Sequence, residues 1–142
     1  MATEGSTHRS VTISRIASTK FSVTNERGGE MVIAAGEGAD FTPIELLLAA
    51  IGGCTAIDVD ILTGRRSEPD AFTVRVDADK VRDAQGNHLS DIVVAFHIAF
   101  PDTPAGDDAR AILPDVVSKS HDRLCSVGRT VEIGTPIATR IS

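Results

Sequence analysis

The stretch TPIELLLAAIGGCTAIDVDILTG, residues 42–64, decides how this chain folds. Thr42 is a favourable helix N-cap, Pro43 suits the first helical position, and Glu45 completes a capping box three residues past the cap. These signals predict a helix that begins at Pro43, spans roughly 20 residues or about 30 Å, and ends near Gly64.

The middle of this predicted helix, Leu46–Ile57, is apolar or small on every face. That pattern is typical of a helix enclosed by protein, because a surface helix keeps one polar side. One sheet covers only one side of a helix, so we expect a second copy of the chain on the other side, which predicts a homodimer. The uncharged run is too short to cross a bilayer, which takes about 18–20 residues, so we expect no membrane partner.

Alternating apolar and polar residues on both sides of the helix predict an α+β domain. Before the helix, three short strands at Val11–Ile16, Phe21–Thr24 and Met31–Ala35 are expected to form an antiparallel meander. After it, Ala71–Val81 and Leu89–Phe100 alternate well and are joined by turn residues, which predicts a long β-hairpin.

The residue pattern in the C-terminal part of the chain predicts one more helix and a closing strand. Asp108–Arg123 has the spacing of an amphipathic helix, and Arg129–Ile133 with Ile137–Ile141 has the alternation of an edge strand. A chain of 142 residues can bury one core, so we expect a single domain over residues 1–142, with residues 1–9 flexible.

Charge and composition exclude some classes of partner. A net charge of −6, from 14 basic and 20 acidic residues, has the wrong sign for nucleic-acid binding. Five Phe without Trp or Tyr leave little surface for stacking on bases. Met1–Ser10 contains no apolar run of the kind that signals secretion, so we predict a cytoplasmic protein.

Two cysteines, Cys54 and Cys125, are the first candidates for chemistry. Cys54 follows Gly52 and Gly53 inside the predicted helix, where two glycines cost about 1–2 kcal/mol relative to alanine. Such a pair indicates either close packing of another backbone or access to the thiol. Each cysteine taken alone also fits a small buried hydrophobic residue, and in the cytoplasm a disulfide between them would be transient.

The run Pro43–Ala56, with its cysteine eleven positions after the proline, and the downstream motif CSVGR, residues 125–129, resemble the OsmC/Ohr family of thiol peroxidases. The order of predicted elements is similar to that of the family over nearly the whole chain. The resemblance implies the OsmC-like fold and an intertwined homodimer, whose central helices pack together and whose two active sites lie at the subunit interface.

The resemblance also implies peroxiredoxin-type activity in oxidative-stress defence. In that case Cys54 reduces peroxides, preferentially organic hydroperoxides, and becomes a sulfenic acid, which Cys125 resolves as a Cys54–Cys125 disulfide. No cofactor is implied beyond an external reductant, either a dithiol or a lipoylated protein.

Cys54 needs a positive charge nearby, because a free thiol is only about a few per cent thiolate at neutral pH. The helix dipole does not supply it, since its effect fades within the first turn and Cys54 lies about three turns in. The resemblance implies an arginine from the N-terminal region. Arg27, on a glycine-flanked turn, is the first candidate, and Arg129 is the alternative.

Glu45 departs from the family pattern. In the best-known peroxidase subfamilies, the glutamate that holds the arginine directly follows the motif proline, where this chain has Ile44. At about 100° per residue, Glu45 lies about 180° from Cys54 around the helix. Glu45 is therefore a candidate catalytic residue with two open alternatives, a capping carboxylate only or a group that acts across the dimer interface.

Two other functions stay open. His121 and Cys125, at positions i and i+4, could form a zinc site together with Cys54 or His97. The second alternative is a small-molecule-binding or redox-sensing dimer of the same fold with weak peroxidase activity, which the displaced glutamate favours.

Overall fold

The computed structural model describes residues 7–142, and the chain divides into two compact units. The first unit ends at Leu47, and the second runs from Leu48 to Ser142. The predicted flexibility of residues 1–9 falls largely on residues 1–6, which lie outside the described part. The single domain over residues 1–142 also stays a prediction.

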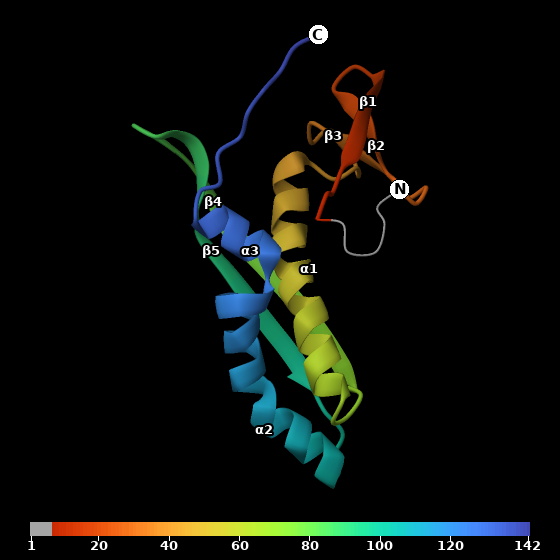
Figure 1. The fold of residues 1–142 in the computed structure, drawn as a ribbon, viewed down its shortest axis with the longest axis vertical. Coiled ribbons are helices and arrows are strands. Elements are labelled where there is room, and N and C mark those ends of the chain that lie inside the picture. Colours follow the sequence, from red (N-terminus) through yellow and green to blue (C-terminus); the bar gives the residue numbers. More distant parts are fainter. Residues whose placement is uncertain (1–6) are drawn as a thin grey trace. The chain divides into compact units, whose positions relative to one another are not determined.

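The first unit holds the predicted three-stranded meander (Figure 1). Antiparallel pairing joins, in chain order, β1 (Val11–Ala17), β2 (Lys20–Asn25) and β3 (Glu30–Ala34). In the turn between β2 and β3, the side-chain oxygen of Asn25 accepts the backbone N–H groups of Arg27 and Gly29, both at 2.9 Å. This turn therefore fixes the backbone of Arg27.

Helix α1 (Pro43–Gly64) has the predicted bounds and starts with the predicted capping box. The Thr42 N–H donates to Glu45 Oε1 at 2.9 Å, and the Glu45 N–H donates to Thr42 Oγ1 at 3.2 Å. Hydrogen bonding of the Glu45 carboxylate to the backbone N–H of Thr42, and next to the Thr42 side chain, holds the pKa of this carboxyl below its ordinary value, because it favours the ionised form.

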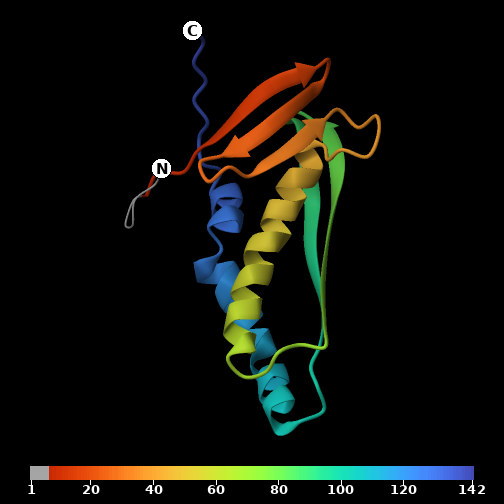
Figure 2. The same ribbon diagram turned by 90° about the vertical axis from the view of Figure 1, so that its right-hand side faces the viewer.

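The second unit contains a long β-hairpin that runs alongside α1 (Figure 2). Strands β4 (Ala71–Asp83) and β5 (Gly86–Ala99) pair antiparallel. Both strands reach further toward the turn than predicted, because their pairing continues to Asp83 and Gly86 and leaves only residues 84–85 in the turn.

Gly52 lies where α1 closely approaches the hairpin. A Cβ atom at Gly52 would overlap Cγ2 of Val76 on β4. At Gly53, by contrast, a Cβ atom would meet no described atom within 4 Å. Gly52 therefore makes room for the Val76 side chain, and not for another backbone as the first of the two alternatives predicted.

The C-terminal helices differ from the prediction in their bounds. Helix α2 (Pro104–Lys119) begins earlier than predicted, because Thr103 accepts the Gly106 N–H at 3.0 Å and caps the first turn. It continues directly into a π-helical turn, η1 (Ser120–Leu124). The wide turn ends immediately before Cys125 and so positions the second thiol.

The prediction of a closing strand is wrong. Neither of its segments, Arg129–Ile133 and Ile137–Ile141, is in a strand, and helix α3 (Ser126–Glu132) covers most of the first. A short apolar alternation predicted the strand, but Cys125 begins a helix here, because its Sγ accepts the Gly128 N–H at 3.2 Å and caps the first turn.

The buried apolar residues of the second unit come from α1, α2 and the segments that join the elements. They are Ile51, Val59, Phe100, Ala109, Val116 and Cys125. Elsewhere on α1, Ile57 and Ile61 are 62% and 54% exposed. The predicted enclosure of α1 is therefore incomplete within one chain, and the second copy that would complete it stays a prediction.

Helix α1 is also long enough and apolar enough to cross a membrane, by length and composition alone. The core helix of a soluble protein passes the same test. In this chain α1 packs along the β-hairpin, where Gly52 meets Val76.

Candidate active site

The fold brings the two thiols together. Cys54 lies in α1 and is half-buried, and Cys125 lies between η1 and α3 and is 4% exposed. Both are free thiols, and they lie close enough for each to shift the pKa of the other. Two sulfurs that are remote in the sequence therefore share one site.

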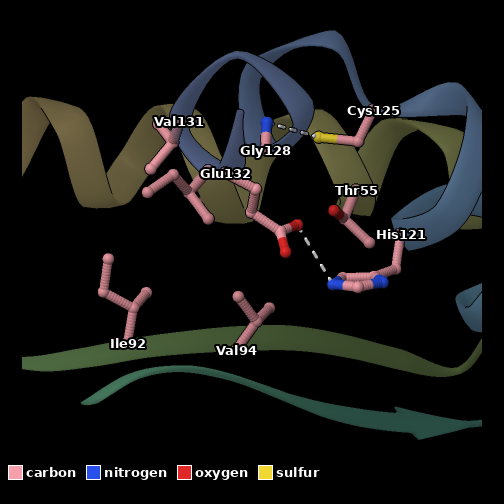
Figure 3. A pocket seen from close by; sticks show the side chains of 9 residues that line it. Thr55, Ile92, Val94, His121, Cys125, Gly128, Val131 and Glu132 are labelled. Carbon is pink, nitrogen blue, oxygen red and sulfur yellow. Dashed lines mark hydrogen bonds and ion pairs between the residues drawn. The ribbon is translucent and has the colours of Figure 1, made fainter. Parts of the chain in front are cut away.

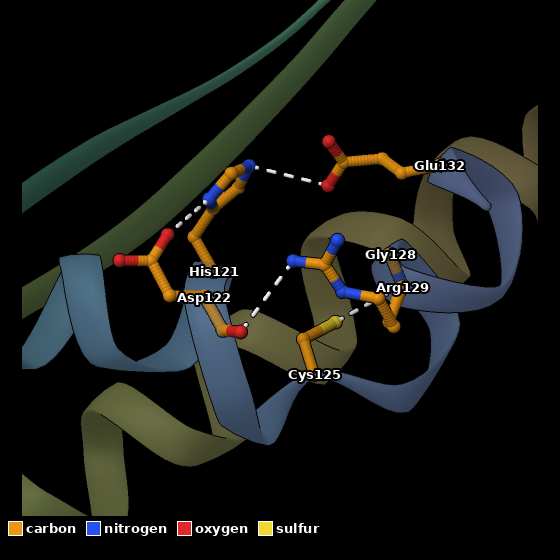
Figure 4. Close-up of polar contacts among 6 residues, drawn as sticks. All are labelled: His121, Asp122, Cys125, Gly128, Arg129 and Glu132. Carbon is orange, nitrogen blue, oxygen red and sulfur yellow. Dashed lines mark hydrogen bonds and ion pairs between the residues drawn. The ribbon is translucent and has the colours of Figure 1, made fainter.

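Cys125 has several hydrogen-bond donors around its sulfur. Burial raises the pKa of the Cys125 thiol, and the charge of Asp58 raises it less strongly. The Gly128 N–H, the Cys54 thiol and the Thr55 hydroxyl lower it, and together they bring this pKa below the ordinary value of a cysteine. Figure 4 shows the contact between Gly128 and the Cys125 sulfur. Among the groups that lower this pKa, the Gly128 N–H has the largest effect.

Cys54 has the opposite environment. Burial raises the pKa of its thiol, and the hydrogen bond to Cys125 and the charges of Cys125 and Asp58 raise it further. A hydrogen bond from the Val127 backbone opposes these effects without overcoming them. Within one chain, the pKa of the sulfur that the family resemblance assigns to the first attack is therefore raised.

Asp58 acts on both sulfurs. It lies one helical turn after Cys54, and its charge raises the pKa of both thiols. Its Oδ2 accepts the hydroxyl hydrogen of Ser120 at 2.8 Å, and Ser120 is fully buried. Asp58 thus joins α1 to η1. The sequence analysis did not name Asp58, although its spacing of four residues from Cys54 placed it on the same helix face.

A pocket of about 240 Å³ opens beside Cys125 (Figure 3). Its apolar walls are Ile51, Ile92, Val94 and Val131, and its polar side chains are Thr55, His121, Cys125 and Glu132. Cys54 is not among the residues that line it. Of the two thiols, Cys125 is therefore the one that faces this space.

His121 lies in the pocket between two carboxylates. Its Nδ1 is 3.0 Å from Asp122 Oδ1, and its Nε2 is 3.3 Å from Glu132 Oε1 (Figure 4). Arg129 Nη2 donates to the Asp122 carbonyl oxygen at 3.4 Å. His121 and Arg129 thus lie in the same unit as the thiols.

The other predicted site residues belong to the first unit. Arg27 lies in the turn between β2 and β3, and Glu45 lies in the first turn of α1. The capping role of Glu45 is present, whereas catalytic roles for Arg27 and Glu45 stay predictions. Among residues 7–142, no group of three or more His, Cys, Asp or Glu is placed to hold a metal ion, so the zinc alternative has no ligand set there.

Residues 36–140 match the model of the family described as OsmC-like protein. No curated protein sequence matches the chain significantly.

Solved structures share the fold. A hypothetical protein from Aquifex aeolicus has a TM-score of 0.71 at 21% identity, covering 90% of this chain and 89% of that chain. An OsmC-like protein of unknown function from Vibrio cholerae has a TM-score of 0.68 at 13% identity, covering 89% and 95%. The organic hydroperoxide resistance protein OhrB of Bacillus subtilis has a TM-score of 0.57 at 14% identity, covering 87% and 90%.

Proposed function

Since the chain belongs to the OsmC-like family, we propose that it is a thiol-dependent peroxidase that reduces organic hydroperoxides in defence against oxidative stress. The observation that carries the proposal is the pair of free thiols, Cys54 and Cys125, beside a pocket with aliphatic walls. Similar folds that are named organic hydroperoxide resistance proteins support the same class of substrate.

The proposed cycle uses both sulfurs. A thiolate attacks the terminal oxygen of the hydroperoxide, the oxygen–oxygen bond breaks, and the sulfur becomes a sulfenic acid. The alkoxide that leaves takes up a proton from solvent and becomes an alcohol. The second thiol condenses with the sulfenic acid, which releases water and forms the Cys54–Cys125 disulfide. An external dithiol or a lipoylated protein then restores both thiols, so the protein needs no bound cofactor. The aliphatic walls favour peroxides that carry a hydrocarbon group.

The family resemblance assigns the first attack to Cys54, with Arg27 as its cation and Glu45 as a further catalytic residue. We retain Arg27 and Glu45 as candidates that a homodimer would bring to the site. The exposed Ile57 and Ile61 of α1 support such a dimer, because burying them against a second copy removes apolar surface from water. A cytoplasmic location is part of the same proposal.

A redox-sensing or small-molecule-binding dimer with weak peroxidase activity is the second candidate. The Asp58 carboxylate favours it, because its charge raises the pKa of both thiols and so slows attack on a peroxide.

The test is turnover of an alkyl hydroperoxide with dihydrolipoamide as reductant. The matched control is the double variant Cys54→Ser/Cys125→Ser, which keeps side chains of similar size and removes both thiols. We expect turnover by the natural chain, none above background by the double variant, and a disulfide in the natural chain by mass spectrometry after one equivalent of hydroperoxide. Turnover equal to that of the double variant excludes the peroxidase, and slow turnover with reversible disulfide formation favours the sensor.

A further inference from the structure

Ser120 makes two hydrogen bonds in opposite directions. It is the buried residue of the π-helical turn η1, whose other four residues are exposed. Its hydroxyl donates to Asp58 Oδ2 on α1 at 2.8 Å, although the two residues are 62 positions apart in the sequence. Its carbonyl oxygen accepts the backbone N–H of Cys125 at 2.9 Å. Ser120 therefore contacts both α1 and the residue that carries the second thiol.

These two bonds tie the backbone of Cys125 to the part of α1 that carries Cys54. Asp58 lies one helical turn after Cys54 on α1. The bond from the Cys125 N–H to the Ser120 carbonyl spans five residues and closes the π-helical turn immediately before the thiol. Single π-helical turns are rare and frequently lie at functional sites. The wide turn and its attachment to α1 together set where the backbone of Cys125 lies.

The bond between Ser120 and Asp58 is also a strong one of its kind. The Ser120 side chain is fully buried, so its hydroxyl has no water to bond in place of Asp58. Hydrogen bonds to a charged acceptor are shorter and stronger than those between neutral groups. We therefore expect this contact to persist in the reduced chain and to restrict the movement of η1 against α1.

We propose that Ser120 is a positioning residue for the thiol pair: through Asp58 it fixes η1 against α1, which holds Cys125 within reach of Cys54 and promotes closure of the disulfide. The proposal rests on the proposed peroxidase function for the use of that disulfide. It holds whichever sulfur attacks the peroxide.

Closure of the disulfide depends on position because the bond forms only in a narrow range of geometries. In the proposed cycle, one cysteine thiol attacks the sulfenic sulfur of the other. The sulfur–sulfur bond forms, the sulfur–oxygen bond breaks, and the hydroxyl leaves with the thiol hydrogen as water. If η1 moved freely, its ordering at this step would cost entropy and disfavour the disulfide. With Ser120 bonded to Asp58, that ordering is complete before the sulfurs react.

The test measures the disulfide equilibrium of Ser120→Ala without any peroxide. The chain is equilibrated with reduced and oxidised glutathione, and mass spectrometry gives the oxidised fraction. Cys54 and Cys125 lose two electrons and two protons and form one disulfide, while oxidised glutathione gains them and becomes two thiols. We expect the equilibrium constant for the protein disulfide to fall by about 10-fold in Ser120→Ala.

The matched control is Thr63→Val. Thr63 is also fully buried, but its hydroxyl donates to the Val59 carbonyl oxygen at 2.8 Å within α1 and does not contact η1. We expect Thr63→Val to keep the natural equilibrium constant, and circular dichroism checks that both variants fold. An unchanged constant in Ser120→Ala, or an equal fall in Thr63→Val, would overturn the proposal, because either result leaves the loss of a buried hydroxyl with no specific effect on the thiols.

A second pair of variants breaks the same bond from the side of α1. Asp58→Asn and Asp58→Ala both remove the charge, so they differ only in whether an oxygen remains to accept the Ser120 hydroxyl. We expect the equilibrium constant of Asp58→Ala to be about 10-fold below that of Asp58→Asn. Equal constants in the two variants would contradict the proposal, even if Ser120→Ala did not fold.

The link to the proposed cycle is tested with one equivalent of an alkyl hydroperoxide and a 1,3-dicarbonyl trap for sulfenic acids. We expect Ser120→Ala to carry more trapped sulfenic acid than the natural chain, because its disulfide closes more slowly. If the natural chain consumes no peroxide above Cys54→Ser/Cys125→Ser, the proposed function fails. The glutathione equilibria would still decide the positioning role of Ser120, because they involve no peroxide.

Discussion

Asp58 accepts the hydroxyl hydrogen of Ser120 while its charge acts on both sulfurs. In Asp58→Asn, the side-chain oxygen still accepts that hydrogen, but the negative charge is gone. We therefore expect both thiol pKa values to fall and the thiols to alkylate faster at neutral pH. The measurement is the pH profile of alkylation by iodoacetamide.

The control for Asp58→Asn is Asp60→Asn, which removes the same charge from an exposed position on α1. We expect Asp60→Asn to leave the alkylation profile unchanged. A profile that shifts equally in both variants would trace the effect to net charge and not to the site.

The paired glycines of α1 allow a second test at the scale of single residues. In Gly52→Ala, the added methyl group overlaps Val76, so we expect a loss of about 1–3 kcal/mol in the free energy of unfolding. In Gly53→Ala, no described atom lies within 4 Å, so we expect a gain of up to about 1 kcal/mol from helix propensity. Urea unfolding measures both. A loss of stability in Gly53→Ala would indicate that a partner occupies this space.

Sequence alone identified the two cysteines but did not assign their environments. The contact of Cys125 with Gly128 is the local cap of α3, but the effect of Thr55 on Cys125 depends on how α3 meets α1, which no local pattern encodes. His121 was noticed only as a metal ligand, because its partner Glu132 comes from the next helix.

At the scale of elements, the first turn of α1 carries a pH-dependent contribution to stability. The hydrogen bonds with Thr42 lower the pKa of Glu45 in the folded chain below that in the unfolded chain. This contribution is therefore present above the unfolded pKa and is lost as pH falls through the folded pKa. We expect Glu45→Gln, which keeps a capping side chain, to lose less stability on acidification than the natural chain.

Urea unfolding at neutral and at acidic pH measures this difference. Identical losses of stability in the natural chain and in Glu45→Gln would contradict an ionised Glu45 as the cap of α1.

The elements that could be predicted well from the sequence carry strong local sequence signals. The bounds of α1 follow from a proline, a capping box and a terminal glycine, and the meander and hairpin follow from regular alternation. The closing strand failed because five alternating residues fit a strand as well as a short helix, and the cap at Cys125 favours the helix. Long elements with strong end signals were predictable, and a short element capped by a sulfur was not.

At the scale of the whole molecule, the apolar face of α1 predicts assembly. Ile57 is 62% exposed in one chain, and burial against a second copy would remove it from water. We expect the natural chain to sediment as a dimer and Ile57→Asp to sediment as a monomer. The control is Ile137→Asp, which changes an isoleucine that is 93% exposed beyond α3. A monomeric natural chain, or a dimeric Ile57→Asp, would contradict assembly through this face.

The Cys125 sulfur both caps α3 and belongs to the thiol pair. A disulfide would draw that sulfur toward Cys54 and weaken its acceptance of the Gly128 N–H, so oxidation would loosen the first turn of α3. The redox state is thereby coupled to the local stability of the C-terminal segment. We expect faster amide hydrogen exchange over residues 126–132 in the oxidised chain than in the reduced chain, and equal exchange would show that the cap survives oxidation.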